Sequence, residues 1–143
     1  MPIDPAAAQR CLTRFARQPA MAATGASVSA IDAGQFEIML PFSAHLTPQH
    51  GYIHARITAM IADTACGFAA RSLMPEDAAA PTTQFKLNRL APAKGERLIA
   101  VGRVVRPGKT LMVCLVFAED AGKRKQIALM TASNSGRHGH GVA

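Results

Sequence analysis

One long apolar segment, between residues 52 and 73, most restricts the folds open to this chain. Its larger side chains recur at intervals of three and four residues, the spacing of one helical face: Ile53, Ile57, Met60, Ile61, Thr64 and Phe68. Pro75 closes the segment, because proline cannot continue a helix. The sequence therefore predicts a helix from Tyr52 to Leu73 whose apolar surface other elements must cover.

The rest of the chain predicts mainly strands joined by short turns. Residues 26–42 are interrupted by Asp32-Ala33-Gly34, which suits the turn of a hairpin. Four further strand-like segments follow the long helix, over residues 82–90, 97–105, 110–118 and 126–132. Their short, turn-favouring separators indicate antiparallel neighbours. The predicted fold class is α+β, a long antiparallel sheet wrapped around one central helix.

A shorter helix is expected at the N-terminus. Asp4-Pro5 resembles an N-cap followed by proline at the first helical position, and residues 6–16 then favour helix with Leu12, Phe15 and Ala16 as the apolar side. Pro19 is expected to end it. We therefore predict a single domain over residues 1–133, in which 1–20 form the N-terminal helix and a linker, and a disordered tail over 134–143.

The charge balance narrows the choice of partner. The chain has a formal net charge of +7, but its 16 Lys and Arg residues are dispersed and it contains no Trp. The dispersion of the positive charges argues against nucleic acid as the partner. The net positive charge suits a small ligand that carries phosphates equally well. No apolar run approaches the roughly 20 residues that span a membrane. The cysteines Cys11, Cys66 and Cys114 are far apart, which favours reduced core residues in a cytoplasmic protein.

Asp63 is the candidate catalytic residue. It is the only acidic or basic side chain between Ile57 and Ala70, and burying a carboxylate costs several kcal/mol unless partners compensate. Stability alone would rarely place it there, whereas a general base or a carboxylate nucleophile would need it. The alternative is a structural role, in which Asp63 caps a turn or pairs with an arginine such as Arg71 or Arg89.

His54, at the start of the predicted helix, is the second candidate. It precedes Asp63 by nine residues, about 13 Å along a helix, so the two cannot form a dyad within one chain. The free N–H groups of the helix start could still polarise a carbonyl, and the start of one chain could face Asp63 of another. His45, His50 and His54 do not predict a metal site, because Pro48 and Gly51 interrupt them.

Two blocks of sequence resemble the signature of phenylacetate-degradation-type hotdog thioesterases. The first is Gln49-His50-Gly51-Tyr52-Ile53-His54-Ala55-Arg56 followed by Met60-Ile61-Ala62-Asp63-Thr64-Ala65, and the second is Phe85-Lys86-Leu87-Asn88-Arg89-Leu90-Ala91-Pro92-Ala93-Lys94. The resemblance covers residues 26–133 and implies the hotdog fold. Two positions depart from the family pattern. Pro48 replaces an asparagine, and Arg56 replaces the second glycine after the histidine.

The resemblance also implies roles for individual residues. Asp63 would activate water or attack a thioester carbonyl, and Thr82 would assist the water. The Ala55 amide of the opposing subunit would hold the oxyanion. His54 would orient the loop that carries Ala55 or touch the thioester. The remaining residues expected to contact the substrate are Gln49, Gly51, Tyr52, Arg56, Thr64 and Thr83.

The function that the resemblance implies is hydrolysis of an acyl-coenzyme A, which we expect to carry an aryl or medium-chain acyl group, to the free acid and coenzyme A. No metal or organic cofactor is implied, since coenzyme A is part of the substrate, and the chain should form a dimer or a dimer of dimers. The alternative is a hotdog protein that binds or senses acyl-coenzyme A without hydrolysing it, because Arg56 has abolished hydrolysis at the site. A hydratase fits less well, because no Asp and His are spaced to form its dyad.

Overall fold

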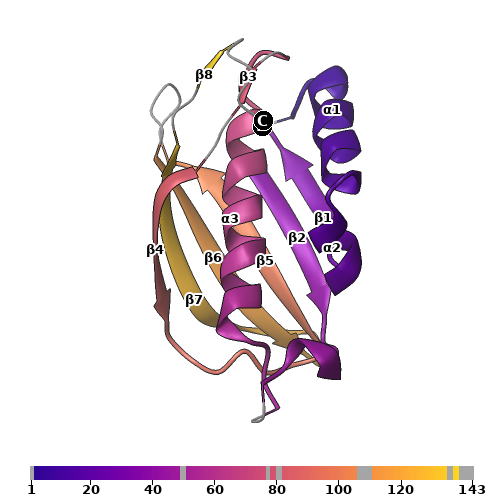
Figure 1. Ribbon diagram of the computed structural model, residues 1–143, viewed down its shortest axis with the longest axis vertical. Helices are drawn as coiled ribbons and strands as arrows, with labels where there is room; N and C mark the ends of the chain where they lie inside the picture. The colour runs from indigo at the N-terminus through magenta and orange to yellow at the C-terminus, as the bar shows by residue number, and fades with distance from the viewer. Residues whose placement is uncertain are drawn as a thin grey trace.

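A computed structural model describes residues 2–48, 51–76, 78–79, 82–105, 111–134 and 137–138. Six strands form one antiparallel sheet in the order β1-β2-β5-β6-β7-β4. Their bounds are β1 Ser27–Asp32, β2 Gln35–Pro41, β4 Thr82–Arg89, β5 Arg97–Val104, β6 Leu111–Asp120 and β7 Lys123–Asn134. Helix α3 (Ala55–Arg71) crosses one face of this sheet (Figure 1). The predicted fold class is confirmed.

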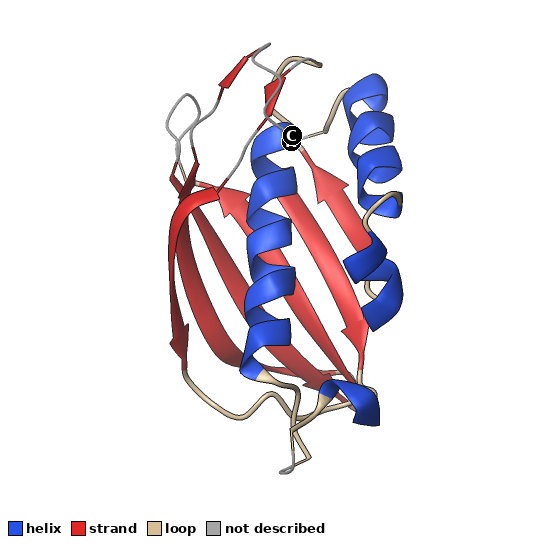
Figure 2. Ribbon diagram, in the orientation of Figure 1, coloured by secondary structure: helices blue, strands red, loops and turns tan. Residues whose placement is uncertain are grey.

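Smaller elements complete the structure. Helices α1 (Pro5–Ala16) and α2 (Pro19–Thr24) lie beside β1, and a 3-10 helix, η1 (Ala44–Leu46), precedes α3 (Figure 2). The two-residue strands β3 (Ala78–Ala79) and β8 (Arg137–His138) pair with each other. No helix among the residues that the structure describes is long and apolar enough to span a membrane.

The N-terminal helix, α1, packs against the hydrophobic core. Asp4 caps α1 as predicted, since its Oδ2 accepts a hydrogen bond from the Ala7 N–H at 3.1 Å. Phe15 contacts the rings of Phe36 and Phe68 with centroids 6.0 and 5.9 Å away, which joins α1 to β2 and α3. The predicted apolar face of α1 was partly wrong. The buried side chains are those of Ala7, Cys11 and Phe15, whereas Leu12 is 37% exposed.

Three other details differ from the sequence-based expectation. Pro19 begins α2 instead of simply ending α1, because proline suits a first helical turn. Strand β7 runs through Asn134, which is buried, so the predicted tail would begin inside a strand. Part of the predicted tail, Arg137–His138, forms β8, and residues 135, 136 and 139–143 lie outside the described part of the chain.

Strand pairing also departs from the simple hairpin order. Strands β1 and β2, β5 and β6, and β6 and β7 pair as consecutive neighbours, but β4 pairs with β7 instead of β5. The connection from β4 to β5 therefore passes two strands, β7 and β6. As a result β4 is an edge strand, at the side of the sheet opposite to β1 and α1 (Figure 1).

Helix α3 lies unusually close to the sheet. Its buried side chains are mostly small and include Ala62, Ala65, Cys66 and Ala69, so the predicted stripe of larger residues is only partly the buried face. A Cβ built on Gly102 of β5 would lie 2.4 Å from the carbonyl carbon and oxygen of Ala65. Gly102 therefore permits a backbone approach that any side chain would prevent.

The three cysteines are free and buried. Burial raises the pKa of the Cys11 thiol, and contact with Cys66 together with burial raises the pKa of Cys114. The thiols of Cys11 and Cys114 are therefore protonated at neutral pH, and all three cysteines pack as small core residues, as the sequence predicted.

Candidate active site

Asp63 lies at the middle of α3, on its flank towards the edge strand β4. Its side chain is half-buried, and its Oδ1 accepts a hydrogen bond from the Thr82 hydroxyl at 2.5 Å. The structure therefore brings together two residues that are 19 positions apart in the chain. A short hydrogen bond to a carboxylate is stronger than a neutral one and holds the acceptor in a fixed orientation.

A β-bulge sets the position of Thr82. In the pairing of β4 with β7, Thr82 is opposite Asn134 and Gln84 is opposite Ser133, so Thr83 is an extra residue. The Thr83 hydroxyl donates to the Ser133 carbonyl oxygen at 3.2 Å, which fixes the bulge. Bulges often redirect side chains next to active sites. Thr83, predicted to contact substrate, is thus seen bonded to the neighbouring strand.

An open cavity of about 160 Å³ adjoins Asp63 and Thr82. Thr64 and Gly67 of α3 line it, so the predicted substrate-contacting residue Thr64 shares this cavity with the carboxylate. The other lining residues are Gln18, Phe68 and Arg71, of which Gln18 and the lining role of Arg71 had no signal in the sequence. The Asp63 carboxylate thus has free space beside it where a reactant could bind.

One of the two structural alternatives for Asp63 was an ion pair with an arginine. Among the described residues, no ion pair joins Asp63 to Arg71 or Arg89. The Arg71 guanidinium instead lies over the Phe68 ring, 5.8 Å from its centroid. Burial, and secondarily the positive charge of Arg14, lower the pKa of Arg71 from its usual value. Asp63 is therefore not held as the partner of a buried cation.

The start of α3 is fixed from both sides. Ile53 N–H donates to the Ala93 carbonyl oxygen and His54 N–H to the Leu46 carbonyl oxygen, both at 2.9 Å. His54 is the N-cap residue, and its Nδ1 accepts a hydrogen bond from the Arg56 N–H at 3.0 Å. A neutral His54 therefore carries its proton on Nε2. These contacts hold the backbone around Ala55 in place.

Ala55 is the first residue of α3, where backbone N–H groups have no partner within the helix. In the described part of the chain no hydrogen bond uses the Ala55 N–H as donor. Ala55 precedes Asp63 by eight residues, which is about 12 Å along the helix axis. One chain therefore presents a carboxylate and an amide donor that cannot act on the same carbonyl.

The remaining predicted residues lie around the helix start. Gly51 has a φ of +76°, a backbone conformation that favours glycine. Tyr52 lines a small cavity that Ala55 also lines. Arg56 is exposed on the first turn of α3. Gln49, also predicted to contact substrate, lies outside the described residues, as does His50. The His45 ring shares a hydrogen bond with the Ser43 hydroxyl at 2.5 Å.

The Thr82–Asp63 contact makes a direct prediction. Thr82→Val preserves the shape of the side chain and removes the hydroxyl, so Asp63 loses its fixed orientation but keeps its charge. We expect turnover of thioester substrates to fall about tenfold, the lower range for loss of one positioning contact. Steady-state kinetics would show the loss in kcat, and Thr82→Ser should restore it. Equal losses in both variants would point to packing instead.

Comparisons with known proteins agree with this geometry. The model of the thioesterase superfamily matches residues 50–127, which include both the start of α3 and Asp63. A thioesterase family protein from Silicibacter pomeroyi is 45% identical, with 90% of this chain and 96% of that one covered and a TM-score of 0.85. A Halobacterium salinarum protein named as an esterase is 39% identical over 94 residues, which span 62% of each chain.

The resemblance to the phenylacetate type is confirmed at the level of fold. The PaaI protein of the Escherichia coli phenylacetic acid degradation operon superimposes with a TM-score of 0.79, at 22% identity and with 93% of this chain and 94% of that one covered. With the family match over more than half of its length, this chain belongs to the thioesterase superfamily and has the hotdog fold.

Proposed function

We propose that this protein hydrolyses acyl-coenzyme A thioesters, with an aryl or medium-length acyl group, to the free acid and coenzyme A. The observation that carries the proposal is Asp63, a half-buried carboxylate in an apolar helix that is bonded to Thr82 beside an open cavity. A hydrolase needs such a group to activate water or to attack the carbonyl itself. The family to which the chain belongs supports the same chemistry.

In the proposed reaction an oxygen nucleophile adds to the thioester carbonyl carbon and the C–S bond then breaks. With Asp63 as base, the carboxylate takes the proton of water, and Thr82 keeps it aligned. With Asp63 as nucleophile, water hydrolyses the resulting anhydride. In both routes the thiolate of coenzyme A leaves and takes up a proton, and water supplies the second oxygen of the free acid. No metal or organic cofactor enters either route.

The carbonyl oxygen gains negative charge during the addition and needs a donor. We assign this role to the Ala55 N–H, because a helix start combines an unpaired donor with the positive end of the helix dipole. Since Ala55 lies about 12 Å from Asp63 of its own chain, the donor must come from a second protomer. His54 would then hold the donor in place, and Gly51, Tyr52, Arg56 and Thr64 would contact the substrate.

The edge strand β4 supports a dimer that would meet this need. It carries Thr82 beside Asp63, one of its edges has no neighbouring strand among the described residues, and Phe85 on it is 46% exposed. Unpaired strand edges readily pair with another chain. A two-fold axis perpendicular to the sheet beside β4 would run the two copies of β4, and with them the two copies of α3, antiparallel, so that the start of each helix approaches the middle of the other.

Thiol release from a panel of aryl and acyl-coenzyme A substrates tests the activity. A colorimetric thiol reagent should report turnover with at least one substrate class. The Asp63→Asn variant, purified in the same way, gives the background rate. Binding of coenzyme A thioesters without thiol release would instead identify a non-catalytic binding protein.

A complementation experiment tests the shared site. Ala55→Pro removes the donor N–H at a position that tolerates proline, and His54 already has the extended backbone (φ −57°, ψ 136°) that a residue before proline needs. Alone, Ala55→Pro and Asp63→Asn should both be inactive. A mixed dimer places the intact Ala55 of one chain opposite the intact Asp63 of the other, so a refolded equal mixture should recover about a quarter of wild-type activity.

The same mixture also has a negative control. A chain that carries both substitutions, mixed with wild type, leaves every mixed site with one defective member and should add no activity beyond that of the wild-type dimers. Failure of the two single variants to complement, in a mixture shown to form mixed dimers, would mean that the site lies within one chain.

A further inference from the structure

The hydroxyl of Thr58 is a buried polar group that the proposed reaction does not use. Thr58 is 2% exposed on the face of α3 towards the sheet, and its Oγ1 has no hydrogen-bond partner in the described part of the chain. Burying a hydroxyl without a partner typically costs about 1–3 kcal/mol. An apolar side chain of the same shape, such as valine, would avoid that penalty. The position thus has a polar group that packing alone does not require.

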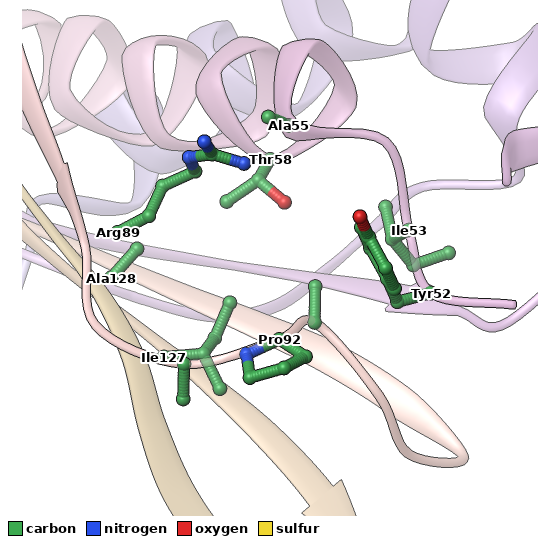
Figure 3. Close-up of a pocket in the computed structure, with 10 residues that line it drawn as sticks. Tyr52, Ile53, Ala55, Thr58, Arg89, Pro92, Ile127 and Ala128 are labelled. Atoms are coloured by element: carbon green, nitrogen blue, oxygen red, sulfur yellow. The ribbon is translucent and has the colours of Figure 1, made fainter. Parts of the chain in front are cut away.

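The Thr58 hydroxyl faces a cavity of about 30 Å³ at the start of α3. Figure 3 shows Arg89 extending from the end of β4 towards Thr58, while the Tyr52 ring stands on the opposite side with its hydroxyl directed into the same space. Ala55 lines the cavity as well, and Pro92 and Ile127 form its apolar wall. Hydroxyl and guanidinium donors therefore converge on a space large enough for about one oxygen atom or water molecule.

The cavity is next to the atoms of the proposed reaction. Thr58 follows Ala55 by three residues, which places it about 4.5 Å further along the helix axis. If the Ala55 N–H holds the thioester carbonyl oxygen, Thr58 lies beside the first few carbons of the acyl group. A donor at that distance would meet an oxygen on the third or fourth carbon and would meet nothing on a plain alkyl chain.

The charge at the cavity favours an acceptor. Arg89 is exposed, and among the described residues it has no ion-pair partner. A guanidinium donates hydrogen bonds and cannot accept them, and a threonine hydroxyl can donate to any oxygen acceptor. The arrangement suits a hydroxyl or carboxylate oxygen better than a donor group such as an amine.

We propose that Thr58 and Arg89 form a specificity subsite for acyl groups that carry an oxygen near the thioester, as in 3-hydroxyacyl or short dicarboxylic acyl-coenzyme A. This inference rests on the proposed thioesterase function and adds the chemical class of the acyl group. Such a substrate would give the buried hydroxyl of Thr58 a hydrogen-bond partner. Sites built to hydrogen-bond a substrate oxygen reject analogues that lack it, because the polar groups of the site then remain unpaired.

Two matched substrate pairs test the proposal. Octanoyl- and 3-hydroxyoctanoyl-coenzyme A differ by one hydroxyl, and butyryl- and succinyl-coenzyme A differ chiefly by a carboxylate in place of a methyl group. We expect the wild-type kcat/KM to favour the oxygen-bearing member of at least one pair by about tenfold or more. The first pair reports recognition of a hydroxyl, and the second reports recognition of a carboxylate.

Substitutions then assign the preference to the subsite. Thr58→Val should reduce the preference ratio about tenfold or more, whereas Thr58→Ser, which keeps the hydroxyl, should retain it. Arg89→Gln, at an exposed position, should lower the ratio for the succinyl pair and gives a second test should Thr58→Val fail to fold. Thr131→Val, on the exposed side of β7, is the matched control and should leave both ratios unchanged.

The outcomes distinguish the specificity subsite from the thioesterase activity on which it rests. Thiol release with no preference in either pair, or a preference that survives both Thr58→Val and Arg89→Gln, would overturn the subsite while leaving the thioesterase proposal intact. Equal loss of preference in Thr58→Val and Thr58→Ser would also overturn it, because packing would then be responsible. No thiol release from any substrate would refute the thioesterase proposal itself.

Discussion

Asp63→Asn is expected to lower thioester hydrolysis at least about a hundredfold while leaving the fold intact, the loss typical of removing a base or nucleophile. Asparagine has almost the same shape as aspartate, and its side-chain oxygen can still accept the hydrogen bond from Thr82. It cannot take a proton from water or attack a carbonyl carbon. The kcat for thiol release should therefore fall, while the affinity for the substrate changes little.

Asp32→Asn provides the matched control, because Asp32 is the last residue of β1, where its Oδ1 accepts a hydrogen bond from the Ala33 N–H of the turn that follows. Asparagine can make the same contact there, and activity should remain at the wild-type level. Circular dichroism should give similar melting curves for both variants. An Asp63→Asn protein with undiminished turnover would remove Asp63 from the reaction and return it to a structural role.

The candidate site was predictable where its signal is local in the sequence. Asp63 stands out because its neighbours along α3 are apolar, and the helix start at His54 and Ala55 was visible as a motif before the helix. Neither inference needed knowledge of which strands pair. The Thr82 position came from the family resemblance, and the structure supplies its physical basis in the hydrogen bond to Asp63.

Features that depend on distant contacts were not predictable in the same way. The pairing of β4 with β7 joins segments about forty to fifty residues apart and leaves β4 at the edge, although its next neighbour in sequence is β5. The bulge at Thr83 exists only within that pairing. The cavity around Thr58 likewise requires Arg89, Pro92 and Ile127 to meet the start of α3, which no short motif specifies.

The buried face of α3 shows the same limit. Periodicity correctly located the helix, but it ranked Ile57 and Met60 above the small residues that actually face the sheet. Small side chains are buried there because the helix backbone comes close to β5, and that approach is possible only because residue 102 is glycine. Sequence periodicity shows which apolar side chains share one face of an element, and it contains no information on how near the opposing element lies.

Gly102→Ala should therefore be the most destabilising single-methyl change in this part of the core. The added Cβ would lie 2.4 Å from the carbonyl carbon and oxygen of Ala65 and 2.7 Å from the Cys66 nitrogen. These are backbone atoms of α3, so no side-chain rotation can relieve the clash and the helix must move away from the sheet. We expect a loss of about 3 kcal/mol in the free energy of unfolding, at the upper end for overpacking, measured by urea denaturation.

Asp63 lies two residues before Ala65, so a displacement of α3 should also disturb its contact with Thr82 and reduce activity. Gly67→Ala is the matched control for stability, because a Cβ there meets no atom within 4 Å and alanine favours a helix over glycine by about 1 kcal/mol. That variant should be at least as stable as wild type. A Gly102→Ala protein as stable as Gly67→Ala would show that α3 can shift at little cost, and the close approach of helix and sheet would then not determine where Asp63 lies.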